Sequence, residues 1–208
     1  MKTLLLDYDG VVLRNKTCTQ YQLRRSARFV QSKTNFSMEQ SELINKTHYI
    51  KYGHTVNMLN IMFNSRTTLE EYNEFVFDTN KIKKLNRFID KETHTHGMKF
   101  NNVITKCENE NINWYIYTNA HINWVKHFSN LMSLPINENK IIWPENLDLL
   151  KPHLKSYDRI DSMFPDHKFM MVDDSIGNLF IPEKKSWDTM LFGPAHDADH
   201  IVRALSAI

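Results

Sequence analysis

Three short apolar runs in this sequence each lead directly into a cluster of small polar residues. The runs span residues 3–6, 114–117 and 169–172, and the clusters that follow them are Asp7-Tyr8-Asp9-Gly10, Thr118-Asn119 and Asp173-Asp174-Ser175. Unbroken apolar runs of this length are typical of strands buried on both faces of a parallel sheet. Weaker strand candidates lie at residues 141–143 and 190–192, and helical patterns lie at residues 100–107 and 122–131. Because strands alternate with helices, we expect an α/β fold with a parallel sheet.

Residues 17–91 break this alternation, since they contain no convincing strand. Ser37 with Gln40 and Thr68 with Glu71 have the spacing of capping boxes, and each pair predicts the start of a helix. Gly53 is placed to end a helix. We therefore expect a core domain of residues 1–14 and 92–208, interrupted by a helical domain of residues 15–91.

Charge, cysteine content and the N-terminal apolar run limit the partners and the compartment that we expect for this protein. A formal net charge of +2 over 208 residues gives no reason to expect a nucleic acid polymer or a membrane surface as partner. Cys18 and Cys107 stand alone, which favours a reducing compartment, although a disulfide between them stays possible on sequence grounds. The apolar run before Asp7 is too short for a signal peptide or a membrane span, so we expect a cytoplasmic protein.

The acidic clusters predict a metal site. Ligands of open α/β sheets bind at the carboxyl ends of the strands, where Asp7, Asp9, Asp173 and Asp174 would meet. Carboxylates that lie so close repel one another, and a divalent cation removes the conflict. An all-oxygen ligand set suits Mg²⁺.

Three further residues complete a site for phosphoryl transfer. Lys151 follows the weak strand candidate at residues 141–143 and adds a positive charge. Thr118 and Asn119 offer hydroxyl and amide donors. Carboxylates, a hard cation, a lysine and neutral donors together favour chemistry on a phosphate group.

These segments resemble the four ordered motifs of the haloacid dehalogenase (HAD) superfamily. The segments that carry the resemblance are Asp7-Tyr8-Asp9-Gly10-Val11-Val12, Tyr115-Ile116-Tyr117-Thr118-Asn119, Lys151-Pro152 with Tyr157, and Val172-Asp173-Asp174-Ser175 with Asn178 and Leu179. The resemblance covers nearly the whole chain. It implies a Rossmann-like parallel sheet core, an inserted α-helical cap domain and a phosphatase that uses Mg²⁺.

The resemblance also implies roles for individual side chains. Asp7 would be the nucleophile, form an aspartyl-phosphate and ligate Mg²⁺. Asp9 would protonate the leaving oxygen and then deprotonate water, while its backbone carbonyl binds the metal. Thr118 and Lys151 would hold the phosphoryl oxygens, and Lys151 would keep Asp7 charged.

The remaining motif residues complete the expected set. Asp174 would be the main acidic metal ligand, with Asp173 assisting it. Gly10 and Asn119 are further candidates for binding phosphate. Asn178 departs from the pattern, because many members carry an acidic residue there, and this weakens the expected metal shell.

The position and sequence of the inserted helical domain narrow the choice of subfamily within the superfamily. Only about a helix and a strand separate Thr118 from Lys151, which is too little for a larger cap domain at that point. The cap is therefore the insertion after the first motif. Within it, residues 49–53 with Leu59, and residues 71–76, resemble segments of pyrimidine 5′-nucleotidase-like members.

The leading hypothesis is therefore a phosphatase that acts on nucleotides or another small phosphometabolite. A sugar-phosphate mutase of the same superfamily is one alternative, because such mutases share the first motif and a helical cap. A binding or regulatory protein that has kept the fold and lost turnover is another.

Overall fold

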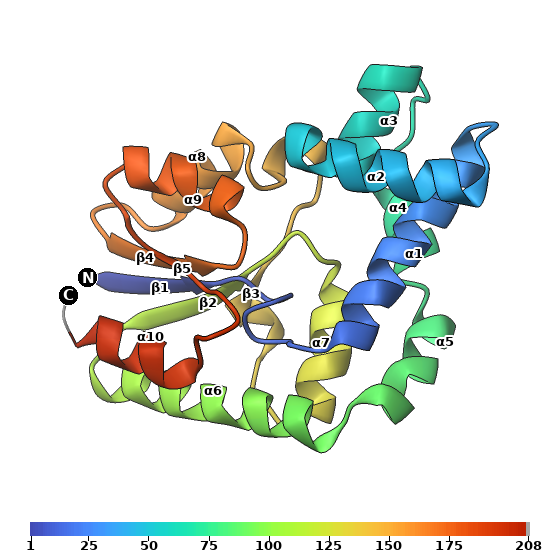
Figure 1. Cartoon of the computed structure of the whole chain (residues 1–208). Helices are drawn as coiled ribbons and strands as arrows, with labels where there is room; N and C mark the ends of the chain where they lie inside the picture. The colour runs from blue at the N-terminus through green and yellow to red at the C-terminus, as the bar shows by residue number, and fades with distance from the viewer. Residues whose placement is uncertain (207–208) are drawn as a thin grey trace.

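The sheet is parallel and five-stranded, in the order β3-β2-β1-β4-β5. The computed structural model describes residues 1–206, except for the side chains of residues 49 and 50. The strands are β1 (Lys2–Leu6), β2 (Asn113–Tyr117), β3 (Ile141–Ile142), β4 (Lys168–Asp173) and β5 (Asp188–Leu191). The α/β prediction and all five predicted strands are confirmed, and the strand that carries the first acidic cluster lies at the centre of the sheet (Figure 1).

Helices cover both faces of the sheet because alternate residues of the central strand are apolar on both sides. Leu4 and Leu6 belong to one hydrophobic cluster and Leu5 to the other. The first cluster is covered by α6 (Lys91–Asn109), α7 (Ile122–Leu131) and α10 (Ala198–Leu205), and the second by α8 (Leu154–Met163) and α9 (Ile176–Lys184) (Figure 1). Two short 3₁₀ turns, η2 (Glu138–Lys140) and η3 (Leu147–Leu149), flank β3.

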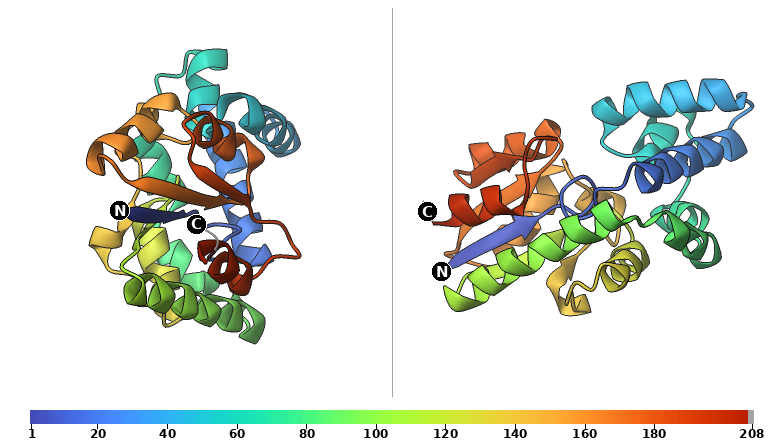
Figure 2. Two further views of the ribbon diagram at one scale, coloured as in Figure 1. Left: turned by 90° about the vertical axis from the view of Figure 1, so that its left-hand side faces the viewer. Right: turned by 60° about the horizontal axis from the view of Figure 1, so that its bottom comes forward.

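The insertion between β1 and α6 is helical, as predicted. It consists of α1 (Lys16–Lys33), α2 (Met38–Tyr52), α3 (Thr55–Phe63), α4 (Leu69–Val76), α5 (Thr79–Ile82) and the 3₁₀ helix η1 (Lys83–Phe88). Figure 2 shows α1 and α2 beyond the carboxyl ends of the strands, where they face the acidic edge of the sheet. We call residues 15–91 the cap.

The structure confirms the residues that were predicted to begin and end helices in the cap. Ser37 and Gln40 bond each other's backbone N–H groups, and Thr68 and Glu71 form a complete capping box. Gly53 follows α2 with a φ of 70°, a left-handed conformation that favours glycine.

The chain passes from the core into the cap near residue 15 and returns near residue 91, and hydrogen bonds of Asn15 link these two segments. This residue caps α1 by accepting from the backbone N–H of Cys18. Its amide group also donates to the carbonyl of Phe88 and to the hydroxyl of Thr93, at 2.9 Å each. This junction supports the division of the chain near residues 14–15 and 91–92, which stays a prediction.

No helix within residues 1–206 is both long enough and apolar enough to cross a membrane.

Candidate active site

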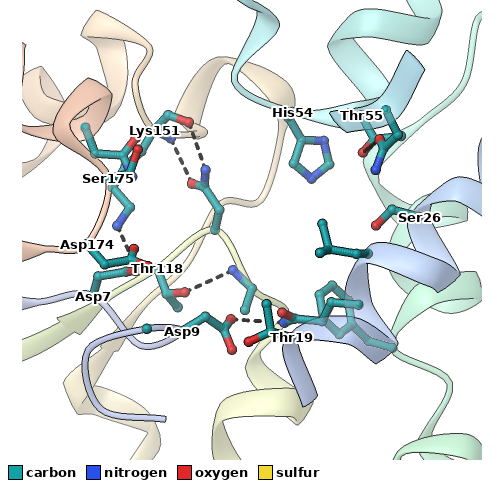
Figure 3. A pocket seen from close by; sticks show the side chains of 18 of the residues that line it. Asp7, Asp9, Thr19, Ser26, His54, Thr55, Thr118, Lys151, Asp174 and Ser175 are labelled. Atoms are coloured by element: carbon teal, nitrogen blue, oxygen red, sulfur yellow. Dashed lines mark hydrogen bonds and ion pairs between the residues drawn. The ribbon is translucent and has the colours of Figure 1, made fainter. Parts of the chain in front are cut away.

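A cavity of about 340 Å³ lies at the carboxyl end of the sheet, beneath the cap. Asp7 and Asp174 reach it from the ends of β1 and β4, and Thr118 reaches it from the end of β2 (Figure 3). Lys151 enters from the loop between η3 and α8. The parallel sheet thus brings the four motif segments to one place, as strand polarity requires.

Three carboxylates lie close together at this cavity, where Asp7 and Asp174 line it and Asp173 is buried behind them. Ligand oxygens of Asp7, Asp173 and Asp174 all lie within 4.8 Å of one another. Burial, together with the charges of Asp173 and Asp174, raises the pKa of Asp7 well above its ordinary value, although Lys151 acts against this. Partial desolvation at the cavity wall and the charge of Asp173 raise the pKa of Asp174 to about 6. A divalent cation held by oxygen ligands would offset this repulsion, so the residues fit Mg²⁺.

Lys151 places a buried positive charge between two of these carboxylates. Its Nζ donates to Asp7 Oδ1 at 2.9 Å, to Asp173 Oδ2 at 2.6 Å and to the carbonyl of Tyr117 at 2.8 Å. Burial alone would lower the pKa of Lys151, but the charges of Asp173 and Asp7 outweigh it and raise that pKa. Lys151 is therefore an ammonium ion that is 1% exposed and fully hydrogen-bonded.

Asp173 and Asp174 occupy different environments. Asp173 is completely buried and accepts from Lys151, from the backbone N–H of Ser175 at 2.9 Å and from the Asn178 amide at 3.0 and 3.1 Å. Asp174 is exposed and lines the cavity. Asn178 thus holds Asp173 in place, and Asp174 offers the carboxylate that a cation can reach.

The turn after β1 brings the backbone close to Asp174. Gly10 has a φ of 85°, and a Cβ added to it would lie 2.1 Å from Asp174 Oδ2. Only glycine fits this position, because a side chain would meet both backbone strain and the carboxylate. Gly10 lines the cavity, and its contact with phosphate stays a prediction.

Asp9 also lines the cavity, with each carboxylate oxygen held by a residue that the sequence did not single out. Trp124 Nε1 on α7 donates to Asp9 Oδ1 at 2.9 Å, and Gln22 Nε2 on the cap helix α1 donates to Oδ2 at 3.0 Å. Burial raises the pKa of Asp9, although these two donors lower it in part. The candidate proton donor is thus fixed jointly by the core and the cap.

Thr118 and Asn119 have distinct positions. Thr118 is buried at the cavity, and its hydroxyl oxygen accepts from the backbone N–H of Ala120 at 3.0 Å. The Asn119 amide donates to the carbonyl of Lys151 and accepts from its N–H, at 2.8 Å each. Asn119 therefore positions the backbone of Lys151, a role not expected from the sequence, and its contact with phosphate stays a prediction.

His54 lies on the cap side of the cavity as a buried neutral ring. It is 4% exposed, caps α3 and packs edge-on against Tyr72, with ring centroids 4.6 Å apart. Burial lowers the pKa of His54 from 6.5 to about 3.

This shift predicts an acid-dependent loss of stability. Between pH 6.5 and about 3 the unfolded chain binds a proton at residue 54 that the folded chain does not, so stability is full above this window and falls with pH inside it. Protonation of residue 54 in the unfolded chain is expected to lower the free energy of unfolding of the wild type by about 2 kcal/mol between pH 7 and pH 5. Urea denaturation of the wild type and of His54→Gln at both pH values measures this, because glutamine does not titrate. Equal losses in the two proteins would refute the prediction.

Comparisons with known proteins support the fold. A scan against protein-family models gives no match, and a search of curated proteins gives no match. Among solved structures, a hydrolase from Pseudomonas syringae is 14% identical, with a TM-score of 0.55, and the alignment covers 100% of this chain and 99% of that one. A phosphoserine phosphohydrolase-like protein from Francisella tularensis subsp. tularensis SCHU S4 is 13% identical, with a TM-score of 0.52 and the same coverage. At these identities the likeness shows the fold alone, and the predicted α/β fold, a Rossmann-like parallel sheet with a helical insertion, is confirmed.

The finer resemblance to pyrimidine 5′-nucleotidase-like members stays a prediction. Part of it falls on residues 49 and 50, whose side chains lie outside the described part of the structure.

Proposed function

We propose that this chain is a magnesium-dependent phosphatase that hydrolyses small phosphate monoesters through an aspartyl-phosphate on Asp7. The observation that carries the proposal is the position of the Asp7 carboxylate, which bonds the buried ammonium of Lys151 and lies beside Asp174 in a cavity that the core and the cap line together. The names of the two neighbouring solved structures, a hydrolase and a phosphoserine phosphohydrolase-like protein, agree with this class of reaction.

Asp7 performs the first half of the proposed reaction. Its free carboxylate oxygen attacks phosphorus, the ester P–O bond breaks, and Asp9 gives its proton to the departing oxygen. The raised pKa of Asp9 favours the protonated form that this step needs. Lys151 and the Thr118 hydroxyl stabilise charge on the phosphoryl oxygens.

Water completes the cycle. Asp9, now a carboxylate, takes a proton from a water molecule that attacks phosphorus, and the bond between phosphorus and Asp7 breaks to release inorganic phosphate. Asp7, Asp174 and the backbone carbonyl of Asp9 would hold Mg²⁺, with Asp173 assisting through its bond to Lys151. When bound, the metal supplies charge neutralisation at the phosphate group.

Release of inorganic phosphate from a panel of nucleotides, sugar phosphates and p-nitrophenyl phosphate tests the proposal. We expect turnover with Mg²⁺ and its loss when EDTA removes the metal. No turnover on any ester with Mg²⁺ would refute the proposal and favour a silent binding protein. Transfer of the phosphate to a sugar hydroxyl would instead identify a mutase.

The substitution Asp9→Asn separates proton transfer from folding. We expect hydrolysis to fall by about 10²–10⁴-fold, because asparagine cannot give or take the proton. Circular dichroism and thermal unfolding show whether the protein remains folded. A folded variant with wild-type turnover would remove Asp9 from the mechanism.

A further inference from the structure

The two sides of the cavity differ in charge. Its charged residues, which are Asp7, Asp9, Lys151 and Asp174, all come from core segments. Every described cap residue that lines the cavity is uncharged. Among the described lining residues, the cap side therefore contributes no fixed ion that could pair with a charge on the part of the substrate beyond the phosphate.

His54 is a hydrogen-bond donor toward this space. Its Nδ1 accepts from the backbone N–H of Val56 at 3.2 Å, so the neutral ring carries its proton on Nε2. Figure 3 shows the ring directed into the cavity between Lys151 and Thr55. A ligand group that meets this ring must accept a hydrogen bond.

A hydroxyl–amide pair and a hydroxyl–hydroxyl pair, both buried, preorganise the rest of the cap wall, which is the set of cap residues that line the cavity. Thr55 Oγ1 donates to Asn45 Oδ1 at 2.7 Å, and the hydroxyls of Ser26 and Tyr72 lie 2.7 Å apart. Asn45 Oδ1 accepts this bond, and the amide N–H groups of Asn45 form no hydrogen bond with any side chain that the structure describes. The wall thus offers neutral donors at His54 and Asn45.

Three of the four core charges already have partners, and the fourth, Asp174, would hold Mg²⁺ under the proposed function. Both oxygens of Asp9 accept from Gln22 and Trp124, and Lys151 is bound by Asp7 and Asp173. A carboxylate or ammonium group buried against the cap wall would stay unpaired, and this opposes binding of a leaving group that carries it.

We propose that the cap wall selects phosphate esters whose leaving group is an uncharged alcohol with hydroxyl or carbonyl oxygens, and rejects leaving groups that carry a carboxylate or an ammonium. This inference rests on the proposed phosphatase function and adds the class of substrate to it. His54 and Asn45 are the specificity-determining donors. Phosphoserine, with both charges on its serine part, is then a poor substrate, although one structural neighbour is named for it.

Three esters built on the same three-carbon frame test the inference in the wild type. Glycerol phosphate has a neutral leaving group, phosphoglycerate adds a carboxylate, and phosphoserine adds a carboxylate and an ammonium. We expect kcat/KM for glycerol phosphate to exceed both others by about 100-fold, because the charged groups find no partner. p-Nitrophenyl phosphate serves as the reference for catalytic competence.

The substitution Asn45→Asp tests the wall itself by adding one charge at nearly constant shape. We expect the ratio of kcat/KM for phosphoethanolamine to that for glycerol phosphate to rise at least tenfold, because the new carboxylate pairs with the ammonium. Asn35→Asp, on the exposed cap loop before α2, is the matched control and should leave the ratio unchanged.

The outcomes separate the inference from the function on which it rests. Hydrolysis of p-nitrophenyl phosphate without a preference for glycerol phosphate over the charged esters would overturn the inference and leave the phosphatase in place. Absence of hydrolysis on every ester would overturn both. If Asn45→Asp does not fold, the wild-type comparison alone decides the question.

Discussion

Replacing Asp7 with asparagine is expected to abolish phosphate-ester hydrolysis while the fold stays intact. The carboxamide is a poor nucleophile and cannot form the acyl phosphate, and loss of a nucleophile costs on the order of 10⁴–10⁶ in rate. Asparagine has nearly the shape of aspartate, and it removes one of three mutually repelling carboxylates, so folding should tolerate it. Phosphate release with Mg²⁺ measures the loss.

The matched control is Asp188→Asn on the exposed surface of β5. It makes the same chemical change far from the cavity and should keep wild-type turnover. Circular dichroism and thermal unfolding of both variants confirm folding. A folded Asp7→Asn protein with turnover like that of the control would refute the mechanism.

Replacing Lys151 with methionine is expected to cost both activity and stability. The substitution leaves Asp7 and Asp173 buried, 8% and 0% exposed, without the ammonium that bonds both. Removing one partner of a buried ion pair costs about 3–5 kcal/mol. In a chain of this length that corresponds to a melting temperature lower by about 6–20 °C. Urea denaturation and phosphate release measure the two losses.

Lys155→Met is the matched control for this prediction. Lys155 and Asp148 lie 2.6 Å apart, as close as Lys151 and Asp173, but their side chains are 64% and 56% exposed. Solvent screens such a pair, so its loss should cost far less stability than the loss of Lys151. Equal destabilisation by the two substitutions would show that Lys151 does not stabilise the buried carboxylates.

Much of the fold is predictable from local sequence. The three leucines before Asp7, residues 4–6, are consecutive because β1 is covered on both faces, and that pattern is visible without any alignment. The capping boxes at Ser37 and Thr68 are local as well, because each joins residues three apart. The acidic residues could be placed together because strand ends in a parallel sheet share one edge.

The support around the site could not be predicted from local sequence. Trp124 and Asp9 are 115 residues apart, and nothing near either one indicates their hydrogen bond. The sequence places Asn119 at the phosphate because it shows only that the side chain is an amide. The hydrogen bonds of this amide to the backbone of Lys151 depend on the path of an irregular loop, which local sequence does not show. Asn178 departs from the expected acidic pattern, and only the packing of α9 on β4 shows that it holds Asp173. The cytoplasmic location and the nucleotidase-like substrate remain predictions.

Chemical trapping of the phosphorylated protein tests the central claim most directly. The wild type is mixed with Mg²⁺ and an ester that carries a radiolabelled phosphate, quenched in acid within one turnover, digested and mapped by mass spectrometry. The account predicts a label on the peptide that contains Asp7, released by hydroxylamine as an acyl phosphate and absent from Asp7→Asn. Turnover in the wild type with no labelled protein, or with the label on another residue, would contradict it.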